Sequence, residues 1–333
     1  MKEREPKMPR YIGPFAKECT EFLTTKHALG YKYKSESRQL VTLDKISFDY
    51  ENNGSMPKEL ILEYIKLKNN ESPKSRNNRI SLMREFAIFL NSLNISAYIP
   101  ELPKLSTSFV PYIFTDKEIQ AFFESVDNIK PQKWPELAHL VYPALFRMLY
   151  GCGLRISEAL RLKIKDVDLH RGILTVKGAK FGKDRLVVMS ESLTKTCADY
   201  AEKAHTFSTD DSRFFPSYDG GEYSITSVYC RFRTLLHKSG ISHGGRGNGP
   251  RLHDFRHTFS VHCLNNWVRT NQNPMVLLPI LSAFLGHSRV SATEKYLRLI
   301  PQMHYDITQK TEKLFANIFP VVEPSLWEGV END

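Results

Sequence analysis

The sequence lacks the features that mark several large classes of protein. Its five cysteines are scattered and never spaced as C-x-x-C, which indicates reduced, mostly buried thiols rather than a disulfide framework or a zinc site. No apolar run approaches the roughly 20 residues that cross a bilayer. The opening MKEREPKMPR has no apolar core of the kind that a signal peptide requires. These absences predict a cytoplasmic protein.

Signatures of bound cofactors are also missing. The turn GCGLRI (151–156) lacks the third glycine of a dinucleotide-binding fingerprint. The loop SHGGRGNGP (242–250) lacks the preceding strand and the Lys-Ser/Thr pair of a phosphate-binding P-loop. His262 and Cys263 are adjacent residues of metal-ligating types, but no second pair accompanies them. The sequence therefore predicts no metal ion and no cofactor.

Positive charge, by contrast, is abundant. The chain carries 46 Lys and Arg against 37 Asp and Glu, a net charge of +9. Residues 1–107 and residues 108–318 each have a basic excess, whereas the tail 319–333 is acidic. Two basic segments suit a polyanion that is bound from two sides. The same charge also fits an ordinary basic soluble protein, so charge alone names no function.

Helical patterns fill the first hundred residues. Gly30 and Gly54 follow apolar-periodic stretches as stop signals, and Pro57 stands where a helix start tolerates its missing N–H. Leu82, Phe86 and further apolar residues recur at the spacing of one helical face. We predict a bundle of four short helices within residues 11–30, 35–54, 56–70 and 72–95. Its basic residues contact phosphates or form a solvated face; they are Lys74, Arg76, Arg79 and Arg84.

The rest of the chain combines helices with one β-hairpin. Residues 99–111 are rich in Pro and Ser and predict a linker, and Thr115 with Glu118 has the spacing of a capping box. GILTV (172–176) and RLVVM (185–189) flank a basic turn and predict a hairpin. Further helices are predicted over 136–150, 155–161, 191–204, 224–239, 253–271, 275–285, 290–299 and 304–318. The predicted fold is mainly α with a small β-hairpin or sheet, in domains 1–106 and 107–319 with a flexible acidic tail, 320–333.

Basic side chains at turns are the first candidates for chemistry. Arg155 follows two turn glycines, so its guanidinium can point outward and offer an anion a fork of donors; it also fits an exposed arginine at a helix start. Glu158, one turn on, supports Arg155 or is an ordinary i,i+3 partner. The lysines of the hairpin turn reach over a bound anion or are solvated; they are Lys177, Lys180 and Lys183.

Histidines and a tyrosine complete the candidate set. In RLHDFRHTF, His253 and Arg256 are three apart and share a helical face, so one can exchange a proton while the other binds an oxyanion. His257 and His262 fall on other faces and are interpreted as structural. In LGHSRVSATEKYLRL, His287 follows a glycine, and the tyrosine nine residues later is a core aromatic or a nucleophile. That tyrosine is Tyr296.

These groups together suit a phosphodiester. Two guanidiniums can neutralise a pentavalent phosphate without the metal pair that serves elsewhere. A tyrosine hydroxyl, with a pKa near 10, is a poor nucleophile until its charge is stabilised and its proton accepted. Covalent attack would conserve the phosphodiester energy in a phosphotyrosine, so a second DNA hydroxyl can reseal the strand without ATP.

The motifs and their order resemble the tyrosine recombinase (phage integrase) family, which includes Xer, Cre and lambda integrase. The matching stretches are GCGLRISEALRL, VKGAKFGKDRLVVM, LHDFRHTFSVH and LGHSRVSATEKYLRL. The resemblance covers residues 110–300 well. It covers the amino-terminal bundle only in size, position and helical character, where it implies a SAM-like core-binding domain before the catalytic domain.

The resemblance implies a role for each matching residue. Arg155 and Arg256 would hold the scissile phosphate, with Glu158 in a supporting position. Lys180 would protonate the leaving 5′-oxygen. His253 would accept the proton of the nucleophile, His287 would bind the phosphate, and the nucleophile would be Tyr296, forming a 3′-phosphotyrosyl bond. Separately from the resemblance, their positive charge predicts DNA contacts for five basic residues, which are Lys74, Arg76, Arg79, Lys177 and Lys183.

The resemblance also implies an assembly on double-stranded DNA. The two domains would clamp the duplex from opposite faces, and four subunits would bring two recombination sites together, placing the protein at the nucleoid. Residues 304–319 would form an amphipathic helix that docks on a neighbouring subunit, or that packs within its own chain. Sister recombinases or DNA-bending proteins are further possible partners.

Three functions compete on this reading. The first is a site-specific recombinase for integration, excision or transposition of a mobile element, favoured over a chromosome or plasmid dimer resolvase of the Xer type because the chain is longer than a minimal Xer protein. The second is a non-catalytic DNA-binding accessory protein of the same fold. The third is a type IB topoisomerase, with the same chemistry and no choice of site.

Overall fold

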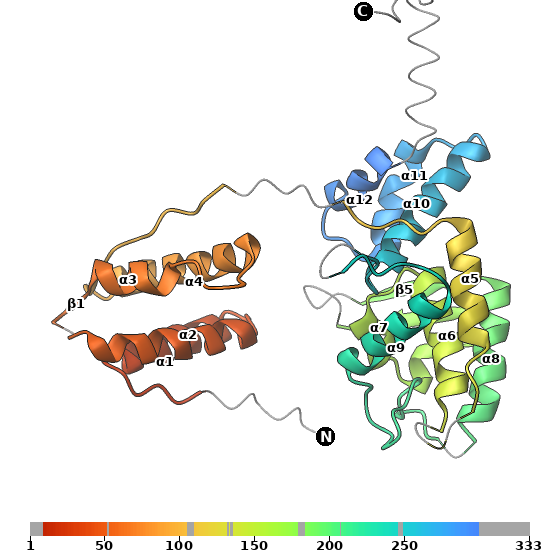
Figure 1. Ribbon diagram of the computed structural model, residues 1–333, viewed down its shortest axis with the longest axis horizontal. Coiled ribbons are helices and arrows are strands. Elements are labelled where there is room, and N and C mark those ends of the chain that lie inside the picture. The colour runs from red at the N-terminus through yellow and green to blue at the C-terminus, as the bar shows by residue number, and fades with distance from the viewer. Residues whose placement is uncertain are drawn as a thin grey trace, which may run out of the picture. The chain divides into compact units, whose positions relative to one another are not determined.

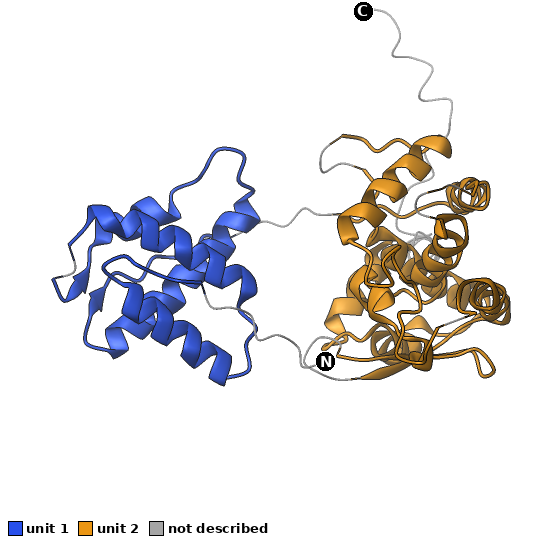
Figure 2. Ribbon diagram, turned by 90° about the horizontal axis from the view of Figure 1, so that it is seen from below, with its two compact units in different colours: residues 1–109 blue, residues 110–333 orange. Residues whose placement is uncertain are grey.

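The computed structural model describes residues 9–51, 53–104, 110–131, 133, 136–178, 184–206, 208–245 and 249–299. The chain divides into two compact units, residues 1–109 and 110–333 (Figure 2). No helix within the described ranges is long and apolar enough to cross a membrane. Several predictions fall outside these ranges: those on Lys180, Lys183, the helix 304–319 and the tail 320–333.

Unit 1 is a bundle of four helices, as the sequence predicts (Figure 1). Ser72 accepts a hydrogen bond from the backbone of Ser75, and Pro73 occupies the first turn, so the last helix has both a cap and a preorganised start. A pair of two-residue parallel strands was not predicted, because two residues show no alternation. The elements among its described residues are α1 (Ala16–Ala28), α2 (Lys34–Ile46), the 3₁₀ helix η1 (Ser47–Asp49), β1 (Ser55–Met56), α3 (Lys58–Ile65), α4 (Pro73–Ser92) and β2 (Ser96–Ala97).

Unit 2 is a larger helical domain around a small sheet. The predicted capping box is present at its first helix, where Thr115 and Glu118 satisfy each other's backbone N–H groups. The mainly helical fold class predicted from the sequence is confirmed. The helices are α5 (Asp116–Asp127), α6 (Ala138–Gly151), α7 (Ile156–Arg161), α8 (Glu191–Ala204), α9 (Ile225–Lys238), α10 (Asp254–Arg269), α11 (Pro274–Leu285) and α12 (Ser291–Glu294).

The predicted hairpin forms two strands of a three-stranded antiparallel sheet. β4 (Ile173–Val176) pairs with β5 (Arg185–Val188), with Leu174 opposite Val187. The sequence did not predict the third strand, β3 (Val167–Asp168), which pairs with β4 through two residues only. Leu174 and Val187 are fully buried, so the sheet presents one apolar face to the domain core.

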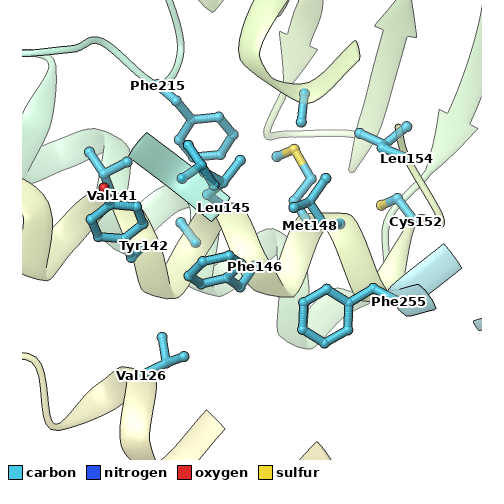
Figure 3. Packing of buried hydrophobic residues seen from close by; sticks show 14 of the residues in the cluster. Val126, Val141, Tyr142, Leu145, Phe146, Met148, Cys152, Leu154, Phe215 and Phe255 are labelled. Atoms are coloured by element: carbon cyan, nitrogen blue, oxygen red, sulfur yellow. The ribbon is translucent and has the colours of Figure 1, made fainter. Parts of the chain in front are cut away.

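The core of unit 2 fixes the ends of α6 and α10. Phe146 of α6 and Phe255 of α10 lie in one buried cluster with other apolar side chains of α6 (Figure 3). Phe122 of α5 packs against both, with ring centroids 5.4 Å from Phe146 and 5.1 Å from Phe255. The turn that follows α6 carries Arg155, and the first turn of α10 carries Arg256. These two arginines therefore project from packed, well-defined positions.

The prediction of a helix over residues 290–299 is wrong in its second half. α12 ends at Glu294, and residues Lys295–Leu299 form a 3₁₀ helix, η4. Pro301 lacks the N–H that would close an α-helical turn onto the carbonyl of Leu297, and 3₁₀ geometry is common where a helix ends. Tyr296 thus lies on a tight 3₁₀ turn that packs against α10.

Candidate active site

Arg256 lies at the centre of the site. Its side chain is 1% exposed, and its two terminal nitrogens donate to the carbonyls of Gly153 (2.7 Å) and Leu285 (2.6 Å). Burial, followed by the positive charge of Arg155, lowers the pKa of Arg256 to about 10, so it stays charged at neutral pH. This guanidinium joins the turn before Arg155 to the turn before His287.

Glycines allow these two turns to approach so closely. Gly153 has a φ of +57°, and a Cβ there would lie 2.8 Å from the ring of Phe259. Gly286 has a φ of +67° and ends α11 with the next backbone N–H bonded to the carbonyl of Ser282, as in a Schellman cap. Both positions need a residue without a side chain. Close packing and a left-handed backbone thus account for Gly153 in GCGLRI and for Gly286 in LGHSRV.

Glu158 connects two arginines. One carboxylate oxygen accepts from Arg155 at 2.7 Å, and both oxygens accept from Arg185, at 3.0 and 2.9 Å. Burial opposes ionisation of Glu158, but hydrogen bonds from Arg185 and from the Arg155 backbone lower its pKa to about 2. Of the two roles left open for Glu158, the geometry supports the one in which it orients Arg155.

Arg185 was not singled out from the sequence. Its side chain is 9% exposed, and its Nε donates to the carbonyl of Phe284 at 2.9 Å. A Cβ at Gly286 would lie 2.9 Å from one of its terminal nitrogens. Arg185 thus ties β5 to α7 and to the end of α11. In the sequence, Arg185 is recognisable only as the residue directly after the predicted hairpin turn. No spacing rule relates Arg185 to Glu158.

His287 and His253 lie close to the arginines. His287 follows the Gly286 cap, and its Nδ1 is 2.7 Å from the hydroxyl of Thr293. Burial, then the charges of Arg256 and Arg155, lower the pKa of His287 to about 4. His253 directly precedes α10, makes no capping hydrogen bond with its side chain, and is exposed. The surrounding protein and the neighbouring His257, Arg256 and Arg155 lower its pKa to about 4 as well, so both rings are neutral near pH 7.

The hydroxyl of Tyr296 points into the same group of side chains. Tyr296 is 5% exposed, and its oxygen lies 2.8 Å from Nδ1 of His257. Burial raises the pKa of Tyr296, whereas the charge of Arg256 and the hydroxyl of Ser260 act in the opposite direction. His257 was interpreted as structural; its bond to the Tyr296 hydroxyl, made where η4 packs against α10, fits that role and also brings His257 next to the candidate nucleophile.

The structure places the predicted DNA-contacting residues in different environments. Lys74 is exposed, and Lys177 is half exposed while pairing with Asp166. Arg76 donates its Nε to the carbonyl of Ile65 at 3.0 Å. Arg79 does not fit the predicted phosphate contact, because its buried guanidinium is bonded to Glu71 and to the carbonyl of Lys66.

Comparisons with known proteins identify the family of the chain. Residues 113–303 match the model of the phage integrase family. The integrase/recombinase y4rB of Sinorhizobium fredii is 30% identical over 311 residues, covering 91% of this chain and 98% of its own. The tyrosine recombinase XerA of Pyrococcus furiosus is 27% identical over 206 residues, which is 60% of each chain. Among solved structures, the Tn1549 transposon integrase in complex with a circular intermediate DNA has a TM-score of 0.58 at 18% identity, covering 84% of this chain and 94% of that one.

The chain therefore belongs to the phage integrase family. It is a tyrosine recombinase, an enzyme of site-specific recombination that cleaves DNA and rejoins it.

Replacing Arg185 by Met should lower both stability and the rate of DNA cleavage. Glu158 would lose its bonds from Arg185 and keep those from Arg155, so the cost should lie at or below the lower end of the about 3–5 kcal/mol for breaking a buried ion pair from one side. Glu158 would then orient Arg155 less well. Thermal unfolding and single-turnover cleavage of a nicked DNA substrate measure the two effects.

Two variants serve as controls for Arg185→Met. The double variant Arg185→Met/Glu158→Leu removes both charges and should recover stability but not cleavage. Arg171→Met breaks an exposed pair with Asp168 (3.9 Å) and should change stability by no more than about 0.5 kcal/mol. Wild-type cleavage by Arg185→Met would contradict its positioning role.

Proposed function

We propose that this tyrosine recombinase cuts and rejoins the ends of a mobile element, for its integration, excision or transposition, through a 3′-phosphotyrosyl intermediate at Tyr296. The observation that carries the chemistry is the convergence of the Tyr296 hydroxyl, the buried guanidinium of Arg256 and the carboxylate-oriented Arg155. This arrangement suits in-line attack on a phosphodiester.

The proposed roles follow from these positions. Arg155 and Arg256 hold the non-bridging oxygens of the scissile phosphate and stabilise the charge that develops there. His287, neutral and fixed by Thr293, offers a further hydrogen bond to the phosphate. Tyr296 attacks phosphorus after a neighbouring histidine accepts its proton. Lys180, from the sequence resemblance, protonates the leaving 5′-oxygen. Resealing is the same exchange in reverse, driven by a 5′-hydroxyl of the partner strand.

The wider assembly is part of the proposal. Unit 1 and unit 2 each bind the duplex, largely through phosphate contacts of basic side chains that include Lys74 and Lys177. Four subunits bring two recombination sites together, with residues 304–319 docking between subunits. The protein acts in the cytoplasm, at the nucleoid, with accessory DNA-bending proteins or sister recombinases where the element requires them.

A mobile-element role is favoured over dimer resolution. The y4rB relative, which spans nearly the whole chain, is named an integrase/recombinase. One structural neighbour is a transposon integrase, and others are XerH site-specific recombinases. The chain also carries a segment, residues 265–277, that lengthens it relative to a minimal Xer protein. The relative XerA, which matches a smaller share of the chain, supports the alternative of a dimer resolvase.

The test is incubation of the protein with DNA from the borders of the element that carries its gene, followed by detection of an SDS-stable adduct. An adduct confined to border DNA is expected. It should form in EDTA at a rate within about twofold of that in Mg²⁺, because guanidiniums supply the positive charge at the phosphate.

The other outcomes identify the competing functions. Adducts on any duplex, with relaxation of plasmids, would indicate a topoisomerase. Adducts only at a chromosomal or plasmid dimer site would indicate a resolvase. Tight binding to border DNA with no adduct would indicate an accessory protein, and a strict Mg²⁺ requirement would contradict the proposed active site.

A further inference from the structure

Two histidines at the start of α10 are candidates for the proton acceptor, and they differ in what they contact. His257 Nδ1 lies 2.8 Å from the Tyr296 hydroxyl, with the two ring centroids 5.5 Å apart. His253 packs instead against His257, edge to face, with centroids 4.7 Å apart at 90°. The family resemblance implies that His253 is the proton acceptor. In the structure, however, His257 contacts the Tyr296 hydroxyl, and the ring of His253 contacts that of His257.

The surroundings of His257 leave its ring unprotonated, so that a nitrogen is available as an acceptor, and they also make it a weaker base than a free imidazole. Burial lowers its pKa to about 4; the carboxylate of Asp254 opposes this, and the charges of Arg251 and Arg256 add to it. The ring is therefore neutral near pH 7, and a neutral imidazole has one nitrogen free to accept a hydrogen bond. Tyr296 has a raised pKa of its own and needs such a partner.

We propose that His257 is the immediate proton acceptor for Tyr296 in strand cleavage, and that His253 acts through it by holding its ring in place. This inference rests on the proposed function and deepens it. The Tyr296 O–H bond breaks and its proton moves to Nδ1 of His257. The phenolate oxygen bonds to phosphorus as the bond from phosphorus to the 5′-oxygen breaks, and the 5′-oxygen takes a proton from a separate acid. In resealing, protonated His257 returns its proton to the departing tyrosine oxygen.

The assignment also explains why Tyr296 can be buried before DNA binds. A hydroxyl bonded to a histidine inside the protein has its polar group satisfied. The same bond keeps the acceptor within about 3 Å of the proton that it must take, which is the distance general base catalysis requires. Among the described residues, no hydrogen bond joins the His253 ring to Tyr296; its ring contacts that of His257 instead.

The experiment compares His257→Ala, His257→Asn and His253→Ala on a nicked DNA substrate under single-turnover conditions. Asn keeps an acceptor oxygen near the position of Nδ1 but cannot take a proton. Both His257 variants should lose roughly 10²–10⁴-fold in cleavage rate, with DNA affinity unchanged. Added imidazoles should rescue His257→Ala, with rates that rise with the pKa of the imidazole added. Base-strength dependence of this kind distinguishes proton transfer from positioning.

His262→Ala is the matched control, because His262 makes a comparable contact, 2.8 Å from the hydroxyl of Tyr150, on the same helix but outside the site. It should cleave at the wild-type rate. Wild-type cleavage by His257→Asn, or rescue of His253→Ala but not of His257→Ala, would overturn the assignment. Absence of an adduct with the wild-type chain would instead contradict the proposed function, so the two failures are distinguishable.

Discussion

Tyr296→Phe is expected to abolish the covalent protein–DNA adduct, because it removes only the oxygen that would bond to phosphorus. DNA affinity should stay within about twofold of the wild type, since phosphate contacts of basic side chains supply most of it. The fold should also survive. The variant loses one hydrogen bond, which contributes about 1 kcal/mol, and the ring that packs against α10 is retained. Denaturing gels with end-labelled DNA measure the adduct, and gel shifts measure the affinity.

Tyr150→Phe is the control for this experiment. Tyr150 also bonds a histidine of α10 through its hydroxyl, at 2.8 Å from His262, and it takes no part in the proposed chemistry. It should cleave like the wild type while losing a similar amount of stability. An adduct that persists in Tyr296→Phe, at the same DNA position, would mean that another residue is the nucleophile.

Arg256→Ala is expected to lose both activity and stability. Removing a donor that stabilises a developing oxyanion costs about 10²–10³-fold in rate. Because this variant also loses a full positive charge, its cleavage rate should fall by at least the larger of these factors. The carbonyls of Gly153 and Leu285 would lose their partners inside the protein. Each buried, unsatisfied group costs about 1–3 kcal/mol.

Arg256→Lys separates the two losses. Lysine keeps the charge, but one ammonium cannot reproduce the fixed fork that reaches two carbonyls on different turns. It should therefore recover part of the cleavage rate while remaining less stable than the wild type in thermal unfolding. Arg269→Lys, at the exposed last turn of the same helix, should change neither quantity. A fully stable Arg256→Ala would contradict the structural role of the guanidinium.

The sequence predicted most of the fold because its signals are local. Gly30, the capping box at Thr115 and the β-branched runs around the hairpin each act within a few residues. Local signals failed for two short elements. β3 is too short to show alternation, and the change from α to 3₁₀ geometry at Lys295 has no local signature in the sequence.

The candidate site divides in the same way. Arg155, Arg256 and Tyr296 were singled out as candidates because each lies in a recognisable motif. The contacts of Arg185 and His257 were not predicted, because their partners, Glu158 and Tyr296, lie 27 and 39 residues away in the chain. No periodicity encodes contacts of that kind.

Among the basic residues of the bundle, the sequence predicted one contact that the fold does not allow. Composition shows how many positive charges are present but not which of them are neutralised inside the folded chain. Arg79 reads as a basic surface residue, yet Glu71, eight residues earlier, neutralises it in the interior. A lysine or arginine contributes to DNA binding only if the fold leaves it accessible.

The double attachment of Arg256 has a consequence for how descendants of this protein could lose catalysis. A lineage that kept the chain for DNA binding alone could discard the Tyr296 hydroxyl at little cost to the fold. It could not discard Arg256 without loosening the two turns that this residue joins. Inactive relatives should therefore retain an arginine at the position of Arg256 after the residue at the position of Tyr296 has changed. The presence of that arginine in a homologue is thus little evidence that the homologue still cuts DNA.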